Sequence, residues 1–298
     1  MNLTYGKMKK LFLAQSYQDS WVDYQRSLRE SSCIVWDYVI VTASNEEQAE
    51  AYRQQINYRL ELGVLTDRTK YVVLSDPDGK RVGSGGATFN VLKYLAEQDG
   101  DTDVNHFKGK RILVIHSGGD SKRVPQYSAC GKLFSPVPRE LPNGRPSTLF
   151  AEFIIGMTAV AGRIPEGMLV LSGDVLLLFN PLQIDAQFYG AAAISIKEDV
   201  DTGKNHGVFL NDGTDHVERF LHKQSEEQLR AMGAVNQDNA VDLDTGAVMM
   251  DANLLNSLYG LISTDNQIDE AKFSEFVNEN SRISFYGDFL YPLAKKST

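Results

Sequence analysis

Short apolar runs alternate with longer amphipathic stretches along the first two thirds of the chain. The runs are rich in β-branched and aromatic residues and end at turn residues, which is typical of buried strands. They cover residues 34–42, 71–74, 112–115, 168–171 and 190–197. Helices are predicted between them at 46–62, 87–98 and 148–161. This alternation favours an α/β fold, with a mixed, mostly parallel sheet flanked by helices.

The chain opens with a stretch, residues 7–30, whose apolar positions recur near helical spacing. These positions are Leu11, Phe12, Tyr17, Trp21, Tyr24 and Leu28. The pattern predicts an N-terminal helix packed on the rest of the domain, and docking of this helix against a partner domain is the alternative. The chain therefore divides into a helical segment, 1–30, and an α/β domain, 31–298.

The last third of the chain predicts smaller elements. Residues 206–210 and 217–222 favour a β-hairpin around Asp212-Gly213. Helices are expected at 225–233 and 252–261, and a loop leading into a strand at 242–251, with Thr245-Gly246 at its mouth. A final apolar pattern at 283–293 lies close to the end of the sequence, so we expect a domain that continues in a longer protein.

The acidic composition narrows the classes of function. Lys and Arg number 30 and Asp and Glu 39, for a formal net charge of −9, whereas proteins that bind nucleic-acid backbones usually carry a basic patch. No apolar run predicts a membrane span, and the N-terminus lacks a signal-peptide pattern. Cys33 and Cys130 give neither a disulfide framework nor a zinc spacing. We expect a cytoplasmic protein that binds neither nucleic acid nor membrane.

The strongest candidate chemistry lies in residues 110–138, KRILVIHSGGDSKRVPQYSACGKLFSPVP. A buried strand leads into a glycine loop with polar and cationic side chains. The residues of interest are Gly118, Gly119, Ser121, Arg123, Gly131 and Lys132. Backbone N–H groups in such a loop approach a phosphate closely, and Arg and Lys add positive charge. The pattern predicts a loop that holds the triphosphate of a nucleotide.

A second glycine-rich loop, SDPDGKRVGSGG at residues 75–86, precedes a predicted helix. Its candidate phosphate contacts are Gly83, Ser84, Gly85, Gly86 and Thr88. The spacing is neither G-x-G-x-x-G nor that of a P-loop, and a tight strand-to-helix turn explains the glycines equally well. Two glycine loops after strands favour one cleft at the carboxyl edge of the sheet.

Single polar residues at strand ends complete the candidate site. Asp174 follows a buried strand and a glycine, where a carboxylate suits Mg²⁺ or caps the next turn. Asp288 is a second candidate metal ligand or a helix cap. His206 and Lys223 flank the predicted hairpin, as sugar-phosphate contacts or as a strand-initiating residue and a surface lysine. Neither His206 nor His222, which precedes Lys223, has the nearby partners of a catalytic triad.

The central segment resembles the signature of the sugar nucleotidyltransferases, with Gly131 before Lys132 where that signature has proline. The segments DPDGKRVGSGGAT and IHSGGDSKRVPQYSACGKLFSPVP resemble the fucose-1-phosphate guanylyltransferases and the N-terminal part of the bifunctional fucokinase/fucose-1-phosphate guanylyltransferases. WDYVIVTAS, NHGVF, DTGAVMMD and FYGDFLYPLA support the same branch, over residues 30–294. The resemblance implies a Rossmann-like fold of the nucleotide-diphospho-sugar transferase type. It also implies a C-terminal β-rich region and, in bifunctional members, a sugar-kinase domain.

The resemblance also implies residue roles. The β- and γ-phosphates would be held by Gly118, Gly119 and Arg123, and the α-phosphate by Lys132. Residues 83–88 and Ser121 would line the nucleotide site. Mg²⁺ would be bound by Asp174 and Asp288. The sugar phosphate would be faced by His206, Gly207, Lys223, Thr245 and Gly246.

The implied reaction is nucleotidyl transfer, in which GTP and fucose 1-phosphate give GDP-fucose and pyrophosphate with Mg²⁺ as cofactor. An oxygen of the sugar phosphate attacks the α-phosphorus in line. It is already ionised at neutral pH, so catalysis needs positioning and charge rather than a general base. One alternative is a related enzyme with a different base or sugar. Another is a non-catalytic sugar-nucleotide sensor or regulatory domain of a fucokinase, although the joint presence of Arg123, Lys132 and Asp174 favours catalysis.

Overall fold

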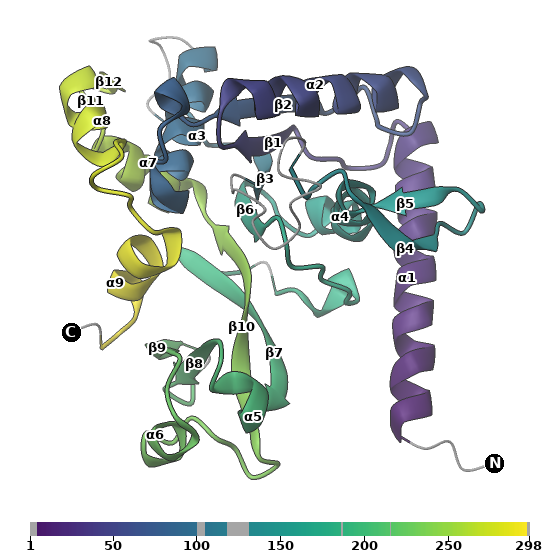
Figure 1. Cartoon of the computed structure of the whole chain (residues 1–298), viewed down its shortest axis with the longest axis vertical. Coiled ribbons are helices and arrows are strands. Elements are labelled where there is room, and N and C mark those ends of the chain that lie inside the picture. Colours follow the sequence, from purple (N-terminus) through teal and green to yellow (C-terminus); the bar gives the residue numbers. More distant parts are fainter. Residues whose placement is uncertain (1–4, 100–104, 118–130, 186, 215, 297–298) are drawn as a thin grey trace. The chain divides into compact units, whose positions relative to one another are not determined.

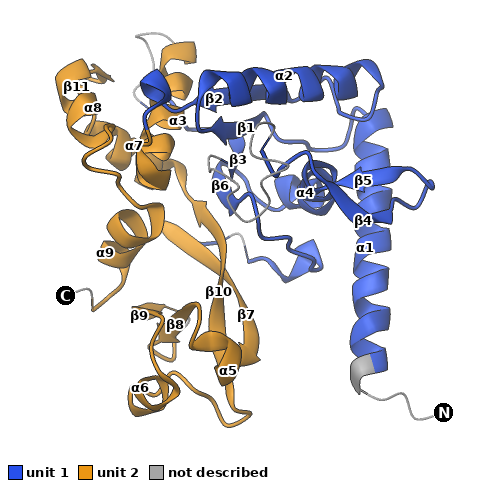
Figure 2. Cartoon of the chain, viewed as in Figure 1, with its two compact units in different colours: residues 1–80, 105–188 blue, residues 81–104, 189–298 orange. Residues whose placement is uncertain are grey.

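The structure, a computed structural model, describes residues 5–99, 105–117, 131–185, 187–214 and 216–296 (Figure 1). The chain forms two compact units (Figure 2). Unit 1 contains residues 1–80 and 105–188, and unit 2 contains residues 81–104 and 189–298. Within the described residues, no helix combines the length and apolar character needed to cross a membrane.

Unit 1 is built on four parallel strands in the order β2-β1-β3-β6. They are β1 (Tyr38–Ala43), β2 (Lys70–Ser75), β3 (Arg111–His116) and β6 (Gly167–Ser172). The middle residues of β3 and β6 are apolar and buried because both faces of these strands are covered. The predicted α/β fold with a parallel core is therefore confirmed. Residues 34–37, predicted as strand, are not, since Trp36 turns inward and its indole N–H donates to Met157 O at 3.0 Å.

Three helices belong to unit 1: α1 (Tyr5–Arg29), α2 (Glu46–Glu61) and α4 (Leu149–Met157), which leads into a 3₁₀ turn at Ala159–Gly162. Asn45 caps α2, because its side chain accepts from the backbone N–H of Gln48. A hairpin of β4 (Pro136–Glu140) and β5 (Pro146–Thr148) was not predicted. Its strands are short and carry prolines, which the usual strand pattern excludes.

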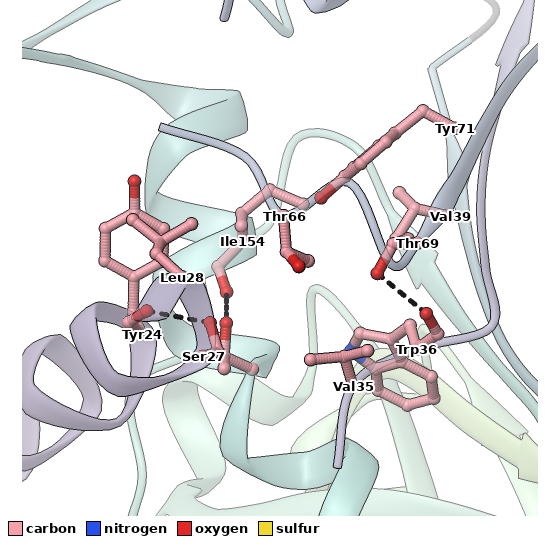
Figure 3. A pocket seen from close by; sticks show the side chains of 11 residues that line it. Tyr24, Ser27, Leu28, Val35, Trp36, Val39, Thr66, Thr69, Tyr71 and Ile154 are labelled. Carbon is pink, nitrogen blue, oxygen red and sulfur yellow. Dashed lines mark hydrogen bonds between the residues drawn. The ribbon is translucent and has the colours of Figure 1, made fainter. Parts of the chain in front are cut away.

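The C-terminal half of α1 packs against the rest of unit 1, as Figure 3 shows for Tyr24, Ser27 and Leu28, which line a pocket together with Ile154 and Trp36. The Tyr24 hydroxyl donates to Val64 O at 2.6 Å. The end of α1 and the turn after it are fixed by one guanidinium, that of Arg68, which donates to four backbone carbonyls. Ser27 O lies in the last turn of the helix, and the other three carbonyls, those of Glu30, Ser31 and Cys33, follow it. In the N-terminal half the predicted packing residues Leu11 and Phe12 are 58% and 57% exposed.

A buried carboxylate joins α1, β4 and α4. Glu152 is 2% exposed, accepts from the Ser147 hydroxyl at 2.6 Å and forms an ion pair with Arg139, whose Nε lies 3.3 Å from Oε1. The Arg139 guanidinium also lies 3.7 Å from the centre of the Tyr17 ring. A buried charge is tolerated when it is paired and hydrogen-bonded in this way, so this cluster fixes the hairpin beside the helices.

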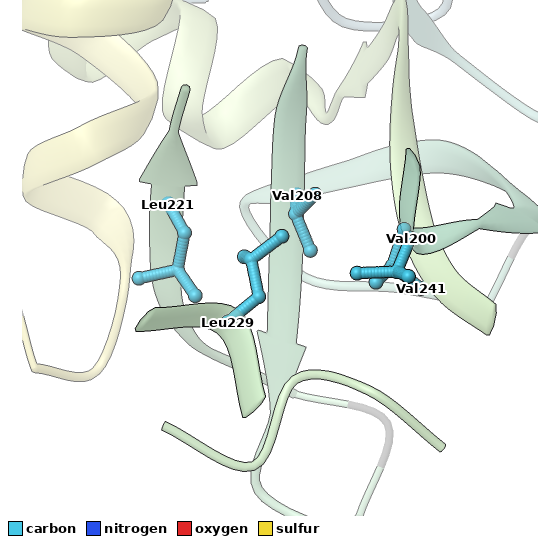
Figure 4. Close-up of a cluster of buried hydrophobic side chains, with 5 residues drawn as sticks. All are labelled: Val200, Val208, Leu221, Leu229 and Val241. Carbon is cyan, nitrogen blue, oxygen red and sulfur yellow. The ribbon is translucent and has the colours of Figure 1, made fainter. Parts of the chain in front are cut away.

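Unit 2 contains an antiparallel set of strands in the order β7-β10-β8-β9. They are β7 (Ala191–Asp199), β8 (Gly207–Asn211), β9 (Val217–His222) and β10 (Ala240–Met250). The predicted hairpin around Asp212-Gly213 is confirmed as the β8–β9 connection. Figure 4 shows the small core of this region. Its members are Val200, Val208, Leu221, Leu229 and Val241.

The remaining elements of unit 2 are short, apart from the helix α3 (Gly83–Asp99). They are the helices α5 (Val200–Gly203), α6 (Glu226–Ala231), α7 (Ala252–Gly260), α8 (Glu270–Phe276) and α9 (Tyr291–Leu293), a π-helical turn at Phe285–Leu290, and the small strands β11 (Ser263–Thr264) and β12 (Gln267–Ile268).

Two boundaries differ from the predictions. Residues 242–251 are not a loop leading into a strand but part of the continuous strand β10, which carries a bulge between Asp244 and Ala247. Glycine in the bulge, Gly246, has φ of +72°. The glycine run 83–86 is not a loop before a helix but the first turn of α3.

Candidate active site

The carboxyl ends of β3 and β6 lie next to each other in the sheet, and two of the predicted site residues meet near them. Lys132 Nζ lies 3.9 Å from Oδ2 of Asp174, and the two side chains are 33% and 58% exposed. An ion pair this exposed contributes at most about 1 kcal/mol to stability. Both charges are therefore available to a charged ligand.

The position of Asp174 depends on the glycine before it. Gly173 N donates to His116 O at 2.9 Å, and a Cβ on Gly173 would lie 2.7 Å from that oxygen. No other residue type fits this approach of β6 to β3 without a shift of backbone. The Ser172 hydroxyl then donates to Oδ1 of Asp174 at 2.7 Å, which leaves Oδ2 as the oxygen nearer Lys132.

The backbone around Lys132 is held on both sides. Gly131 has φ of +69°, and a Cβ there would lie 1.8 Å from the hydroxyl oxygen of Tyr52. On the other side, Phe150 N donates to Leu133 O at 2.7 Å, which ties the segment to the start of α4. The glycine-lysine pair noted in the sequence therefore lies in a turn that needs glycine at position 131. The Lys132 side chain extends from this turn to Asp174, just after the end of β6.

His116 is the last residue of β3. Its Nδ1 lies 3.3 Å from the Thr42 hydroxyl oxygen, and that oxygen accepts from Ser117 N at 3.2 Å. Burial lowers the pKa of His116 from 6.5 to about 4. The imidazole is therefore neutral near pH 7 and supplies no positive charge to a phosphate.

The lowered pKa predicts an acid-sensitive fold. Between pH 6.5 and about 4 the unfolded chain binds a proton at His116 that the folded chain does not, so stability falls as the pH drops through this window. We expect a loss of up to about 3 kcal/mol, measured as the free energy of unfolding in urea at several pH values. The variant His116→Asn should show a flatter profile over the same window, and an unchanged profile would contradict this cause.

The central loop residues predicted to contact the triphosphate are Gly118, Gly119, Ser121 and Arg123. They lie outside the described residues, and their roles stay predictions.

The second glycine run has a packing role. Gly85 N donates to Ile283 O at 2.8 Å, and a Cβ on Gly83 would lie 2.4 Å from the same oxygen. The Ser84 hydroxyl accepts from Phe285 N at 2.9 Å, and the Thr88 hydroxyl donates to Ser84 O. The close approach of residues 283–285 explains these glycines, and neither the phosphate loop nor the tight turn considered from the sequence anticipated it. Nucleotide contacts by Gly83, Ser84, Gly85, Gly86 and Thr88 stay a prediction.

Unit 2 brings the predicted sugar-phosphate residues together at one end of β8 and β9. Lys223 N donates to His206 O at 3.0 Å, and Gly207 pairs with His222 across the hairpin. A Cβ on Gly207 would lie 3.1 Å from the Cβ of Asp244, beside Thr245 and Gly246. The side chains of Lys223 and His206 are exposed, so this end of the hairpin presents cationic and hydrogen-bonding groups.

One residue of this cluster, Asp244, was not predicted. Burial raises the pKa of Asp244, against the opposing effects of the Gly246 N–H and of His222 and His206. Oδ1 of Asp244 accepts from Gly246 N across the bulge at 2.8 Å. The available signal was the strand alternation of Val241, Asp242, Leu243 and Asp244, which the prediction of a loop at 242–251 concealed.

Asp288, the second candidate metal ligand, acts as a helix cap. Its Oδ2 accepts from Ser284 N at 2.7 Å, and the Ser284 hydroxyl accepts from Gly287 N at 3.1 Å. Among the described residues, no three His, Cys, Asp or Glu side chains cluster as a metal site. The cap, one of its two predicted roles, is thus observed, and metal binding by Asp288 stays a prediction.

Comparison with known proteins identifies related sequences. A family model described as the fucose pyrophosphorylase domain matches residues 104–298. The bifunctional fucokinase/GDP-fucose pyrophosphorylase of Arabidopsis thaliana is 28% identical over 95% of this chain and 29% of its own length. The fucose-1-phosphate guanylyltransferase of Homo sapiens is 30% identical over 88% of this chain and 46% of its own length. The L-fucokinase/L-fucose-1-P guanylyltransferase of Bacteroides fragilis is 29% identical over 56% of this chain and 18% of its own length. The chain thus spans less than half the length of these relatives.

Proposed function

The chain belongs to the fucose pyrophosphorylase family, and from this membership and the site we propose that it makes GDP-fucose and pyrophosphate from GTP and fucose 1-phosphate. The observation that carries the proposal is the pair of Lys132 and Asp174 beside the ends of two parallel strands. An exposed ammonium and an exposed carboxylate at this edge suit a phosphate chain and a cation that accompanies it.

In the proposed reaction, an oxygen of fucose 1-phosphate attacks the α-phosphorus of GTP and the bond to pyrophosphate breaks. The Lys132 ammonium stabilises the negative charge that develops on the α-phosphate oxygens. No side chain needs to remove a proton, since the attacking oxygen is already ionised. The neutral state of His116 at the end of β3 is compatible with this chemistry.

Mg²⁺ is the proposed cofactor. Asp174 fits the role of its ligand, because its carboxylate is more than half exposed and Mg²⁺ prefers one or two carboxylates together with phosphate oxygens. A bound Mg²⁺ would supply charge neutralisation along the triphosphate.

For the sugar phosphate we propose the end of the β8–β9 hairpin. Lys223 and His206 are exposed there and their backbones are linked by a hydrogen bond. The partly buried Asp244 accepts from the N–H of Gly246 in the bulge, and this hydrogen bond fixes the backbone at this end. The relatives named as fucokinases suggest that a kinase domain accompanies this part of the family in longer chains, and we assign no fucose phosphorylation to these residues.

The sugar-phosphate assignment predicts the effect of Lys223→Met. We expect the KM for fucose 1-phosphate to rise about tenfold or more, because a charge-assisted contact to a phosphate is lost, while the KM for GTP changes little. Pyrophosphate release at varied concentrations of each substrate measures both constants. Lys204→Met, which removes an exposed lysine paired with Asp201 in the same unit, is the matched control. Equal effects of the two variants would remove Lys223 from the sugar-phosphate site.

The identity of the sugar is tested by a panel of sugar 1-phosphates with GTP held constant. Fucose, mannose, glucose and galactose 1-phosphates carry the same phosphate, so differences in kcat/KM report on the sugar alone. The proposal predicts the highest kcat/KM with fucose 1-phosphate. A higher value for another sugar would keep the reaction and change the substrate.

A further inference from the structure

A cavity of about 170 Å³ lies within unit 1 between α1, the end of α2, the β4–β5 hairpin and α4. These elements are labelled in Figure 1. Neither Lys132 nor Asp174 lines it, and the proposed reaction gives it no role.

One part of the cavity wall is aromatic. The rings that line it are those of Trp21, Tyr24, Tyr58 and Phe150. The Trp21 and Tyr24 rings lie 5.3 Å apart and are tilted by 42°, and the Tyr24 hydroxyl donates to the backbone at Val64. Rings fixed in this way form walls against which a flat apolar group can stack.

Two arginines, Arg59 and Arg145, also line the cavity, and none of the described residues that line it is Asp or Glu. The charges of Arg145 and Arg59 both oppose the burial that raises the pKa of the Tyr24 phenol. The lining thus combines aromatic rings with two cationic side chains.

Arg59 is partly desolvated without an acidic partner. Burial lowers its pKa, its Cζ lies 4.9 Å from the centre of the Phe134 ring, and Nη1 donates to the backbone and side chain of Gln55. Within the described part of the chain, no carboxylate oxygen lies close enough to the Arg59 guanidinium to form an ion pair with it. Arg53 on the same helix differs, because it pairs with Glu46 at 2.7 Å and Glu50 at 3.2 Å. A cation that is removed from water is normally paired with an anion, so the partly desolvated Arg59 is a candidate to bind an anionic ligand.

We propose that this cavity is a second ligand site, which binds a small molecule made of one aromatic ring that carries one anionic group. The guanidinium fork of arginine matches a carboxylate or a phosphate, and the ring would lie among the aromatic side chains. The size suits this class, since cavities of roughly 150 Å³ hold a single benzene ring.

The test is a titration of the intact chain with phenyl phosphate and with benzoate, followed by the quenching of tryptophan fluorescence, because Trp21 lines the cavity. We expect at least one of the two ligands to quench the fluorescence saturably at concentrations below about 10 mM. The ligand with the lower Kd identifies phosphate or carboxylate as the preferred anion. Inorganic phosphate should not compete at the same concentration. No saturation by either probe, or inorganic phosphate that binds as tightly as phenyl phosphate, would overturn the proposal.

Variants locate the binding. Arg59→Gln and Arg145→Gln should each weaken the preferred probe about tenfold or more, as loss of a charge-assisted hydrogen bond does. Arg53→Gln on the same helix should leave its Kd within about twofold. Thermal melting confirms that each variant is folded. An unchanged Kd in both Arg59→Gln and Arg145→Gln would place the probe elsewhere and overturn the proposal. Binding does not depend on catalysis, so the result is independent of the proposed reaction.

Discussion

Replacing Lys132 with alanine is expected to lower kcat for pyrophosphate formation about 10²–10³-fold, the usual cost of removing one charge contact to the transition state. The effect should fall mainly on kcat rather than on KM, because the ammonium acts on charge that develops during the attack. The fold should persist, since the contact that Lys132 makes among the described residues is an exposed ion pair at 3.9 Å.

Steady-state pyrophosphate release measures this effect, and the melting temperature shows whether the variant is folded. Lys108→Ala, which removes an exposed lysine from a turn in the same unit, is the matched control and should leave kcat unchanged. Activity of Lys132→Ala within about threefold of the parent chain would remove Lys132 from the mechanism.

Replacing Asp174 with asparagine is expected to lower kcat by a similar factor, about 10²–10³-fold. Asparagine keeps the size of the side chain and an oxygen for the Ser172 hydroxyl, which donates to Oδ1 at 2.7 Å in the structure. The change therefore removes negative charge and little else. If Asp174 binds Mg²⁺, the variant should also need a higher Mg²⁺ concentration for half of its maximal rate, because a neutral amide is a weaker ligand for a hard cation.

A titration of activity with Mg²⁺ separates this role from a structural one. Asp67→Asn, which neutralises an exposed aspartate of the same unit, should shift neither kcat nor the Mg²⁺ requirement. A lower kcat for Asp174→Asn with an unchanged Mg²⁺ requirement would assign Asp174 to positioning Lys132 rather than to the metal.

The parallel core could be predicted because its strands are apolar runs between clear breaks. β3 and β6 are buried on both faces, and this burial leaves the strongest signal that a single sequence carries. The partners Lys132 and Asp174 could be named for a related reason. Each follows a glycine, and those glycines prove to be required by Tyr52 at Gly131 and by the backbone of His116 at Gly173.

Features that depend on contacts between residues far apart in the sequence could not be predicted. The glycines at 83–86 have the composition of a phosphate loop, yet the backbone at residues 283–285 approaches them, and nothing local shows this. The bulge in β10 breaks the alternation of apolar and polar residues along the strand. For this reason residues 242–251 were predicted to begin with a loop, and the partly buried Asp244 was missed. The unpaired charge of Arg59 is likewise visible only when the cavity around it is assembled.

Pyrophosphate release with Mg²⁺ and fucose 1-phosphate, compared among GTP, ATP, UTP, CTP and dTTP, tests the proposed function most directly. The proposal predicts release with GTP and little with the other four nucleotides. Release with another nucleotide in place of GTP would contradict the guanylyltransferase assignment while keeping nucleotidyl transfer. No release with any nucleotide, from a folded chain that binds GTP in calorimetry, would contradict catalysis by this chain and favour a sugar-nucleotide sensor.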